Sequence, residues 1–394
     1  MPQNKILTLS DLKARHTLLV LDTLRRHDGL SRMELARVAG CDNTTVTRAI
    51  RDLMACGLVV STGKSGAAKG RPREHLTLNT DGPRIIGLAI EPGLVSGALV
   101  DMRGGIHERE CLPYSGTRDT RSLFRALTTI SRHLMSLSEA NLLGMGVSTF
   151  GAGADAAHLD LSAHFPNLGE VDLRGFFLKG IGMIPQFADM LRCRMQYELG
   201  RMPELRDGTT MLVWLDSGIG MNLAVGGQLL PGHLLHGGEL GHNVCEPNGL
   251  LCACGRRGCL ETRCSTGAVL AAARQISGRT NLSFAQLCAL CEAGEPRLNE
   301  ITDHVAHFLG TALANQLNNL NVRHLVLAGG LLQLGGVFRN RLESAIRELL
   351  FPVAASALHI HFREQDDDGL LLGAAFLVQE RLFSDPDFLA SRIP

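Results

Sequence analysis

Apolar side chains recur at helical spacing near the start of the chain, with polar side chains between them. Four leucines fall near one face of residues 13–26, which predicts an amphipathic helix that packs inward. A capping box, formed by Ser31 and by Glu34 three residues later, predicts a second and shorter helix that ends at about Ala39. These two helices are separated by a short glycine-containing break.

Residues 41–57 predict a third helix, capped by Asp42 or Asn43, with an apolar inward face. The opposite face is polar and carries Asn43, Thr44, Thr45, Thr47, Arg48 and Arg51. Short polar side chains and arginines are suited to base edges and phosphates. Two short helices joined by a glycine turn, the second polar at its N-terminal end, are typical of a helix-turn-helix with a recognition helix.

Two strand-like segments, 58–62 and 74–79, flank a tip rich in glycine and basic residues. This pattern predicts a β-hairpin wing whose basic side chains reach the DNA backbone or an adjacent minor groove. The basic residues of the wing are Lys64, Lys69, Arg71 and Arg73. The alternative for this segment is a flexible basic linker.

From Arg84 onward, strands, helices and glycine turns alternate, which predicts an α/β fold. The expected elements are two strands in 84–106, a helix at 119–138, a strand at 142–151, a strand and a helix in 181–199, two strands in 211–230, helices from 268 to 320, a buried strand at 324–329, and a last helix near 370–382 followed by a loosely held tail. We therefore expect a DNA-binding domain over residues 1–80 and a second domain over 81–394.

Charge divides the chain at the same point. The first 80 residues contain 13 Lys and Arg against 7 Asp and Glu, a net charge of +6. The rest of the chain has a net charge of −6, because the whole chain is neutral. A basic head on an acidic body indicates a module that binds nucleic acid, joined to a part that does not.

The eleven cysteines bear on the cellular compartment. The N-terminal segment lacks an apolar core of signal-peptide length, and no apolar run reaches the roughly 20 residues that span a bilayer. We therefore expect a cytoplasmic protein without a membrane partner. Reduced cysteines in such a protein act as metal ligands or as buried thiols.

Four potential metal ligands are concentrated in one stretch of the sequence. His242, Cys252, Cys254 and Cys259 form an H-x9-C-x-C-x4-C array. Four glycines are expected to let the loop turn tightly enough for the cysteines to converge, namely Gly249, Gly255, Gly258 and Gly267. One nitrogen and three sulfur ligands complete the tetrahedral shell of a zinc ion and leave no open position for water, so the expected zinc is structural. The alternative is a set of unrelated free thiols.

Two carboxylates flank this array. Glu239 precedes His242 by three residues, and Glu261 follows Cys259 by two. A loop folded around a metal would therefore bring two carboxylates and one imidazole to the same rim. Carboxylates accept hydrogen bonds from hydroxyl groups, so such a rim suits a sugar.

These features together resemble the ROK family (repressors, open reading frames and sugar kinases), and in particular its transcriptional regulators. The motifs that carry the resemblance are the helix-turn-helix with its wing, SGIG at 217–220, GELGH at 238–242, CACGRRGCLE at 252–261 and AGG at 328–330. The resemblance implies a two-lobed body of the hexokinase/actin type with a sugar between the lobes, and a zinc ion that orders the sugar-binding loop. It also implies sugar contacts from Glu239, His242 and Glu261, with Asp189 and Asn167 as further candidates.

The sequence departs from the kinases of the family at three places. Residues 91–93 read Glu-Pro-Gly where the kinases have a D-x-G-x-T turn, and Pro92 offers no N–H to a phosphate. Asp216 and Asn222 replace glycines of the second phosphate turn. Met190 stands where the kinases have the catalytic Asp. We therefore expect no catalytic residue and no phosphoryl transfer.

The expected function is that of a sugar-responsive transcriptional regulator, a repressor of carbohydrate uptake or catabolism genes. Its expected partners are double-stranded operator DNA, a sugar or sugar phosphate effector, and further copies of the chain in a homodimer or tetramer that reads two half-sites. The first alternative is an active sugar kinase with a DNA-binding head, in which a one-residue shift would restore Asp189 as the base. The second is a regulator that responds to zinc or to thiol oxidation at the metal loop.

Overall fold

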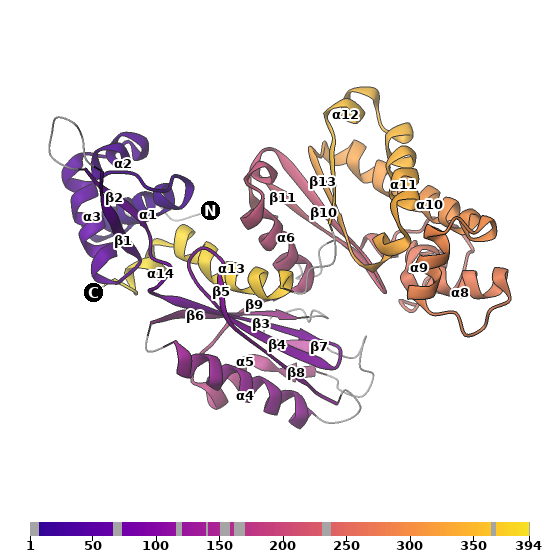
Figure 1. The fold of residues 1–394 in the computed structure, drawn as a ribbon, viewed down its shortest axis with the longest axis horizontal. Helices are drawn as coiled ribbons and strands as arrows, with labels where there is room; N and C mark the ends of the chain where they lie inside the picture. The colour runs from indigo at the N-terminus through magenta and orange to yellow at the C-terminus, as the bar shows by residue number, and fades with distance from the viewer. Residues whose placement is uncertain are drawn as a thin grey trace. The chain divides into compact units, whose positions relative to one another are not determined.

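The structure, a computed structural model, describes residues 8–65, 73–115, 120–138, 141–149, 158–160, 170–230, 238–363 and 368–393. The chain divides into two compact units, of which the first is Met1–Cys193 with Asp368–Pro394 and the second is Arg194–Asp367. Each unit contains one five-stranded sheet, drawn in Figure 1. The expected α/β fold is confirmed. Among the described residues, no helix is both long enough and apolar enough to cross a membrane.

The three N-terminal helices and the hairpin are present as predicted. They are α1 (Leu9–Arg26), α2 (Arg32–Ala39), α3 (Asn43–Ala55), β1 (Val59–Ser65) and β2 (Arg73–Leu78). The Ser31–Glu34 capping box begins α2, and Asp42 caps α3. Helix α1 begins earlier than predicted, because Thr8 and Asp11 form a further capping box.

The sheet of the first unit has the strand order β5-β4-β3-β6-β9. Strands β3, β4 and β5 are antiparallel, whereas β6 and β9 run parallel to β3. The bounds are β3 (Arg84–Glu91), β4 (Leu94–Val100), β5 (Ile106–Pro113), β6 (Leu142–Thr149), β7 (His158–Asp160), β8 (Glu170–Asp172) and β9 (Gln186–Asp189), with α4 (Thr120–Leu137), α5 (Leu173–Phe176), η1 (Phe177–Ile181), α6 (Met190–Arg201), α13 (Gly369–Ser384) and α14 (Pro386–Ala390). Strand β5 was not predicted, because an exposed edge strand carries charged side chains.

Helix α13 packs very closely on this sheet. A Cβ atom on Gly87 would lie 2.1 Å from the carbonyl oxygen of Leu371, and one on Gly146 would lie 1.9 Å from that of Ala374. Glycine is therefore required at both strand positions. The prediction of a loosely held C-terminal tail is wrong, because the tail forms helix α14 and fully buries Leu389.

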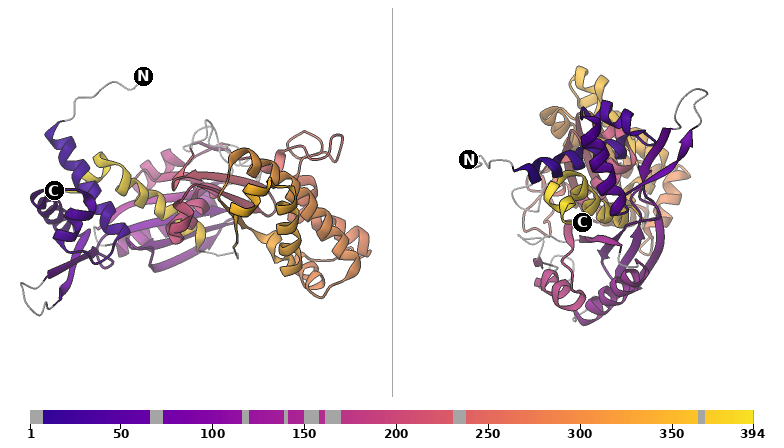
Figure 2. Two further views of the ribbon diagram at one scale, coloured as in Figure 1. Left: turned by 90° about the horizontal axis from the view of Figure 1, so that it is seen from above. Right: turned by 90° about the vertical axis from the view of Figure 1, so that its left-hand side faces the viewer.

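The N-terminal helices share a hydrophobic core with α13, α14 and the sheet. Figures 1 and 2 show the C-terminal helices, in yellow, beside the N-terminal ones, in indigo. The guanidinium of Arg25 lies 3.1 Å from a carboxylate oxygen of Glu380 and 4.6 Å above the ring of Phe383. The predicted boundary near residue 80 stays a prediction, but residues on both sides of it pack together.

The second unit has a sheet of the same pattern, with the order β12-β11-β10-β13-β14. Strands β10, β11 and β12 are antiparallel, whereas β13 and β14 are parallel to β10. The bounds are η2 (Pro203–Arg206), β10 (Thr209–Leu215), β11 (Ile219–Val225), β12 (Gln228–Leu229), η3 (Leu240–His242), α7 (Glu261–Cys264), α8 (Thr266–Ser277), α9 (Phe284–Glu292), α10 (Pro296–Leu320), β13 (His324–Ala328), η4 (Gly330–Leu334), α11 (Gly336–Leu349), α12 (Pro352–Ala357) and β14 (His359–Phe362). Four elements of this unit were not predicted from the sequence, namely β12, α11, α12 and β14.

Candidate functional site

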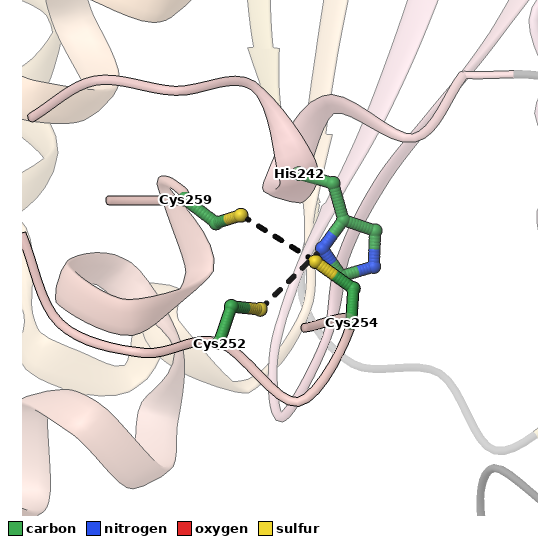
Figure 3. A group of neighbouring side chains, drawn as sticks. All are labelled: His242, Cys252, Cys254 and Cys259. Carbon is green, nitrogen blue, oxygen red and sulfur yellow. Dashed lines mark hydrogen bonds between the residues drawn. The ribbon is translucent and has the colours of Figure 1, made fainter. Parts of the chain in front are cut away.

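The structure brings the four predicted metal ligands together, as Figure 3 shows. Their ligand atoms all lie within 4.8 Å of one another. Cys252 Sγ is 3.7 Å from His242 Nδ1, and Cys254 Sγ is 3.6 Å from Cys259 Sγ. Two ligands of a tetrahedral zinc ion are separated by about 3.5–3.8 Å, given Zn–S and Zn–N bonds of about 2.3 and 2.0 Å. The cluster therefore has the composition and the spacing of a metal site.

The backbone of the metal loop, residues 238–262, holds these ligands in place. Isolated bridges pair Val244 with Cys259 and Leu251 with Arg257. Gly258 has a φ of +74°, and a Cβ atom there would lie 1.7 Å from the carbonyl oxygen of Glu246. Glycine is therefore required beside Cys259, both for its dihedral angle and for the close approach of the backbone.

The other predicted loop glycines differ in their roles. Gly255 has a φ of +84° but no atom within 4 Å of an added Cβ, so its role is conformational. Gly249 allows a close approach, because an added Cβ would lie 2.9 Å from the carbonyl oxygen of Glu246. The expectation that Gly267 shapes the loop is wrong, because Gly267 lies inside α8 with nothing within 4 Å of an added Cβ.

Arg256 contacts the cluster and was not singled out from the sequence, although it lies between two of the ligands. Hydrogen bonds from its backbone N–H and its guanidinium lower the pKa of the Cys254 thiol to about 6. Burial, in contrast, raises the pKa of the Cys259 thiol to about 12. A bound metal favours the thiolate form of both, because the thiolate is the ligand.

The two predicted carboxylates lie near the two ends of this loop. Glu239 Oε2 is 3.9 Å from His242 Nε2, and the Glu239 side chain is 57% exposed. The other ring nitrogen of His242, Nδ1, faces Cys252. Glu261 begins α7 and accepts a hydrogen bond of 3.1 Å from the backbone N–H of Ile219. A Cβ atom on Gly241 would lie 3.0 Å from Glu261 Oε2. The structure therefore brings both carboxylates close to the segment that carries His242.

The remaining predicted sugar contacts lie elsewhere in the chain. Asp189 ends β9 in the first unit, where its carboxylate accepts a hydrogen bond of 2.9 Å from the backbone N–H of Arg192. Burial raises the pKa of this carboxyl group. Met190 is the first residue of α6. Asn167 lies outside the described residues. The sugar contacts stay predictions.

In the turn between β3 and β4, two carbonyl groups accept hydrogen bonds from Tyr114. The Tyr114 hydroxyl donates to the carbonyl oxygen of Glu91 at 2.9 Å, and its backbone N–H donates to that of Gly93 at 2.9 Å. Pro92 occupies the turn position between them, where it supplies no donor. Two carbonyl groups of this turn are therefore held by Tyr114, and its proline offers no backbone N–H to a ligand.

Most of the predicted DNA contacts on α3 are exposed. The exposed members are Asn43, Thr44, Thr47, Arg48 and Arg51. Thr45 is only half-buried and is engaged in the helix cap, because its hydroxyl donates to Asp42 at 2.6 Å and its backbone N–H donates to the same carboxylate at 2.9 Å. Lys64 lies in β1 and Arg73 in β2, whereas Lys69 and Arg71 lie outside the described residues.

The fold of the chain matches that of a solved structure. A crystal structure of a ROK family transcriptional regulator, a homologue of the Escherichia coli Mlc protein, matches this fold with a TM-score of 0.84. The match covers 97% of this chain and 99% of that one, at 21% sequence identity. The fold of the chain is therefore that of a ROK regulator.

The sequence comparisons agree with the fold. Residues 204–381, a little under half of the chain, match the model of the ROK family. The xylose repressor of Bacillus spizizenii is 22% identical over 365 residues, which cover 92% of this chain and 94% of that protein. The DNA-binding transcriptional repressor Mlc of Escherichia coli is 24% identical over 379 residues, which cover 90% of each. The chain thus resembles ROK repressors over nearly its whole length.

Proposed function

We propose that this protein is a DNA-binding transcriptional regulator, a repressor of genes for carbohydrate uptake or catabolism, with a sugar or sugar phosphate as its effector. The observation that carries the proposal is the exposed polar face of α3, presented by a three-helix head with a hairpin. The full-length resemblance to repressors supports it. Helices α2 and α3 then form the helix-turn-helix, with α3 as the recognition helix, and β1 and β2 form the wing.

The metal loop has a structural role in this proposal. The metal is zinc, because one imidazole and three thiolates at tetrahedral spacing are its preferred ligands. When bound, zinc holds the loop together and supplies no reaction, since all four coordination positions belong to the protein. Glu239, His242 and Glu261 then face the effector, and Asp189 and Asn167 are further contacts.

Carboxylates beside an imidazole are suited to a polyol. Each carboxylate oxygen accepts a hydrogen bond from a hydroxyl group, and two carboxylates on one rim fix a sugar in a single orientation. One oxygen of Glu261 already accepts from Ile219, which orients this carboxylate before any ligand binds. Preorganised side chains lose less entropy when the effector binds.

The proposed regulator has no phosphoryl transfer activity. Pro92 and the acidic Asp216 stand in the turns that would have to hold the phosphates of a nucleotide, and Met190 has no group that accepts a proton. The alternative is a sugar kinase with an attached DNA-binding head. Incubation with MgATP and a panel of sugars separates the two, because turnover that Asp189→Ala abolishes would favour the kinase.

The proposed DNA-bound form is a symmetric dimer or a tetramer. One recognition helix makes few base contacts, so a repressor gains specificity from two half-sites related by the symmetry of the protein. The effector then binds free and DNA-bound protein with different affinities. The factor by which the effector changes the affinity for DNA must equal the factor by which DNA changes the affinity for the effector.

Selection of operator DNA by the full-length protein tests the proposal. Random duplex DNA is selected with the zinc-loaded protein, and the enriched sequence is expected to contain two inverted half-sites. Arg48→Ala should weaken binding of this sequence by about 5- to 150-fold, which corresponds to about 1–3 kcal/mol for one base contact. Arg279→Ala is the control, because Arg279 is an exposed arginine of the second unit. Failure to enrich any sequence, or equal effects of the two substitutions, would contradict the proposal.

A further inference from the structure

The carboxylate of Asp216 joins three separate segments of the second unit. Asp216 follows β10, and its Oδ1 accepts a hydrogen bond of 2.7 Å from the backbone N–H of Ser217. Its Oδ2 accepts one of 3.0 Å from the backbone N–H of Gly330, which is 114 residues further along the chain. The hydroxyl of Thr266, the first residue of α8, donates to Oδ1 at 3.5 Å.

Backbone hydrogen bonds fix the position of this carboxylate. The backbone N–H of Asp216 donates to the carbonyl oxygen of Gly218 at 3.1 Å, and the carbonyl oxygen of Asp216 accepts from the backbone N–H of Thr266 at 3.0 Å. Gly330 is buried, and an added Cβ atom there would lie 2.9 Å from Asp216 Oδ2. The donor groups are therefore held in place by the surrounding backbone as well as by the carboxylate.

Two backbone N–H groups and one hydroxyl that converge on a negatively charged group have the chemistry of an oxyanion site. Here the charged group comes from the chain itself. We propose that Asp216 occupies an oxyanion-binding site formed by Ser217, Thr266 and Gly330. Its carboxylate excludes phosphate-type anions because it accepts the hydrogen bonds that such an anion would need. Repulsion between its charge and an incoming phosphate acts in the same direction.

This inference rests on contacts within the second unit and does not depend on DNA binding or on the identity of the effector. It differs from a purely local role for Asp216 as the cap of its own turn. A cap acts only on neighbouring residues, whereas an occupied anion site keeps donors from distant segments in position when the side chain is removed. An external anion should then be able to replace the carboxylate.

Replacement of the side chain by an added anion is the direct test. Asp216→Gly removes the carboxylate and leaves space for an anion of similar size, and the probes are sodium phosphate and sodium formate at constant ionic strength. We expect both anions to raise the Tm of Asp216→Gly with a saturable dependence on concentration. Apparent phosphate binding should be at least about tenfold tighter than in the unsubstituted protein, the factor that roughly one net charge-assisted hydrogen bond supplies.

Asp207→Gly is the matched control. Asp207 is a surface aspartate of the same unit whose side chain is 67% exposed and pairs with Arg323 at 3.0 Å. Phosphate stabilises many proteins without a specific site, and the control measures this general effect. Equal phosphate dependence of the unsubstituted protein and of both variants would overturn the proposal.

A nearly isosteric variant covers the case in which Asp216→Gly does not fold. Asp216→Asn retains one acceptor oxygen but turns an NH2 group toward one of the donors. We expect this variant to fold and bind its metal, with a Tm below that of the unsubstituted protein. An unchanged Tm would overturn the proposal, because the three donors would then not require a carboxylate.

Discussion

The metal loop and the turn at residues 216–220 are two glycine-rich segments of the same unit that satisfy their polar groups in opposite ways. The metal loop directs four ligand atoms toward one another, with separations suited to a shared ion. The turn directs backbone donors toward Asp216, which the chain supplies. The metal loop is thus arranged to take a metal ion from outside the protein, whereas the turn is completed by a carboxylate of the chain itself.

Two such segments should respond differently when a bound group is removed or added. A segment that needs a bound metal ion should lose its structure when the ion, or one of the residues that bind it, is removed. A segment that contains its own carboxylate should not respond to added anions until a substitution removes that carboxylate. Glu261 connects the two segments, because it follows the last cysteine of the metal loop and accepts a hydrogen bond from Ile219 of the turn.

The largest expected effect comes from removal of a metal ligand. Cys259→Ser should abolish stoichiometric zinc binding and destabilise the second unit by about 4 kcal/mol or more, the range expected for loss of a structural metal. Metal content and urea unfolding measure the two effects. Cys288→Ser, at a half-buried cysteine of α9 outside the cluster, should retain the metal. A Cys259→Ser protein that keeps its zinc would show that the cluster is not the site.

A pair of glycine substitutions tests the shape of the metal loop without changing a ligand. Gly258→Ala should destabilise by about 2–4 kcal/mol, because the unfavourable φ and the contact with Glu246 act together. Gly255→Ala has a similar φ but an open surrounding, so only about 1–2 kcal/mol is expected. Thermal unfolding with zinc present gives the comparison. Equal losses would mean that the close approach at Gly258 does not constrain the loop.

Substitution of Glu261 affects the hydrogen bond that joins the metal loop to the turn at residues 216–220. Glu261→Ala leaves the N–H of Ile219 without its acceptor and should reduce the free energy of unfolding by about 1–3 kcal/mol. Glu261→Gln keeps an acceptor oxygen and should have a smaller effect. Both variants should lose the stabilisation by sugar, measured by thermal shift. A normal sugar response in Glu261→Ala would remove this residue from the proposed effector site.

The smallest expected effect concerns pH and a histidine pair outside both segments. His324 Nδ1 and His361 Nε2 are 3.2 Å apart, and burial, followed by neighbouring positive charge, lowers the pKa of both below the ordinary 6.5. The unfolded chain therefore takes up protons first, so stability present above about pH 6.5 is lost as the pH falls through the lowered values. His361→Gln should flatten this dependence in urea unfolding between pH 7 and 5, and an unchanged slope would contradict it.

The metal ligands and the carboxylate rim could be predicted because they are close together in the sequence. The 23 residues from Glu239 to Glu261 contain both carboxylates and all four ligands, so spacing alone indicates the chemistry. The head was predictable for a similar reason, since capping boxes and helical periodicity are local signals.

Features that depend on distant residues could not be predicted. The contact between Asp216 and Gly330 spans 114 residues, and nothing in the local pattern identifies the partner. The C-terminal helix α14 was missed because its apolar residues are few, although Leu389 is fully buried against other parts of the first unit. Strand β14 was missed because none of its four residues is fully buried and two of them are histidines, so the segment resembles a loop.

Reciprocal titration distinguishes an effector-responsive repressor from a protein in which the DNA and sugar sites are independent. The affinity of the zinc-loaded protein for its selected operator is measured by fluorescence anisotropy with and without the sugar that gives the largest thermal shift, and the affinity for that sugar is measured with and without operator. We expect each ligand to lower the affinity of the protein for the other by the same factor, about 5- to 150-fold. Operator affinity that is unchanged at saturating sugar would contradict it.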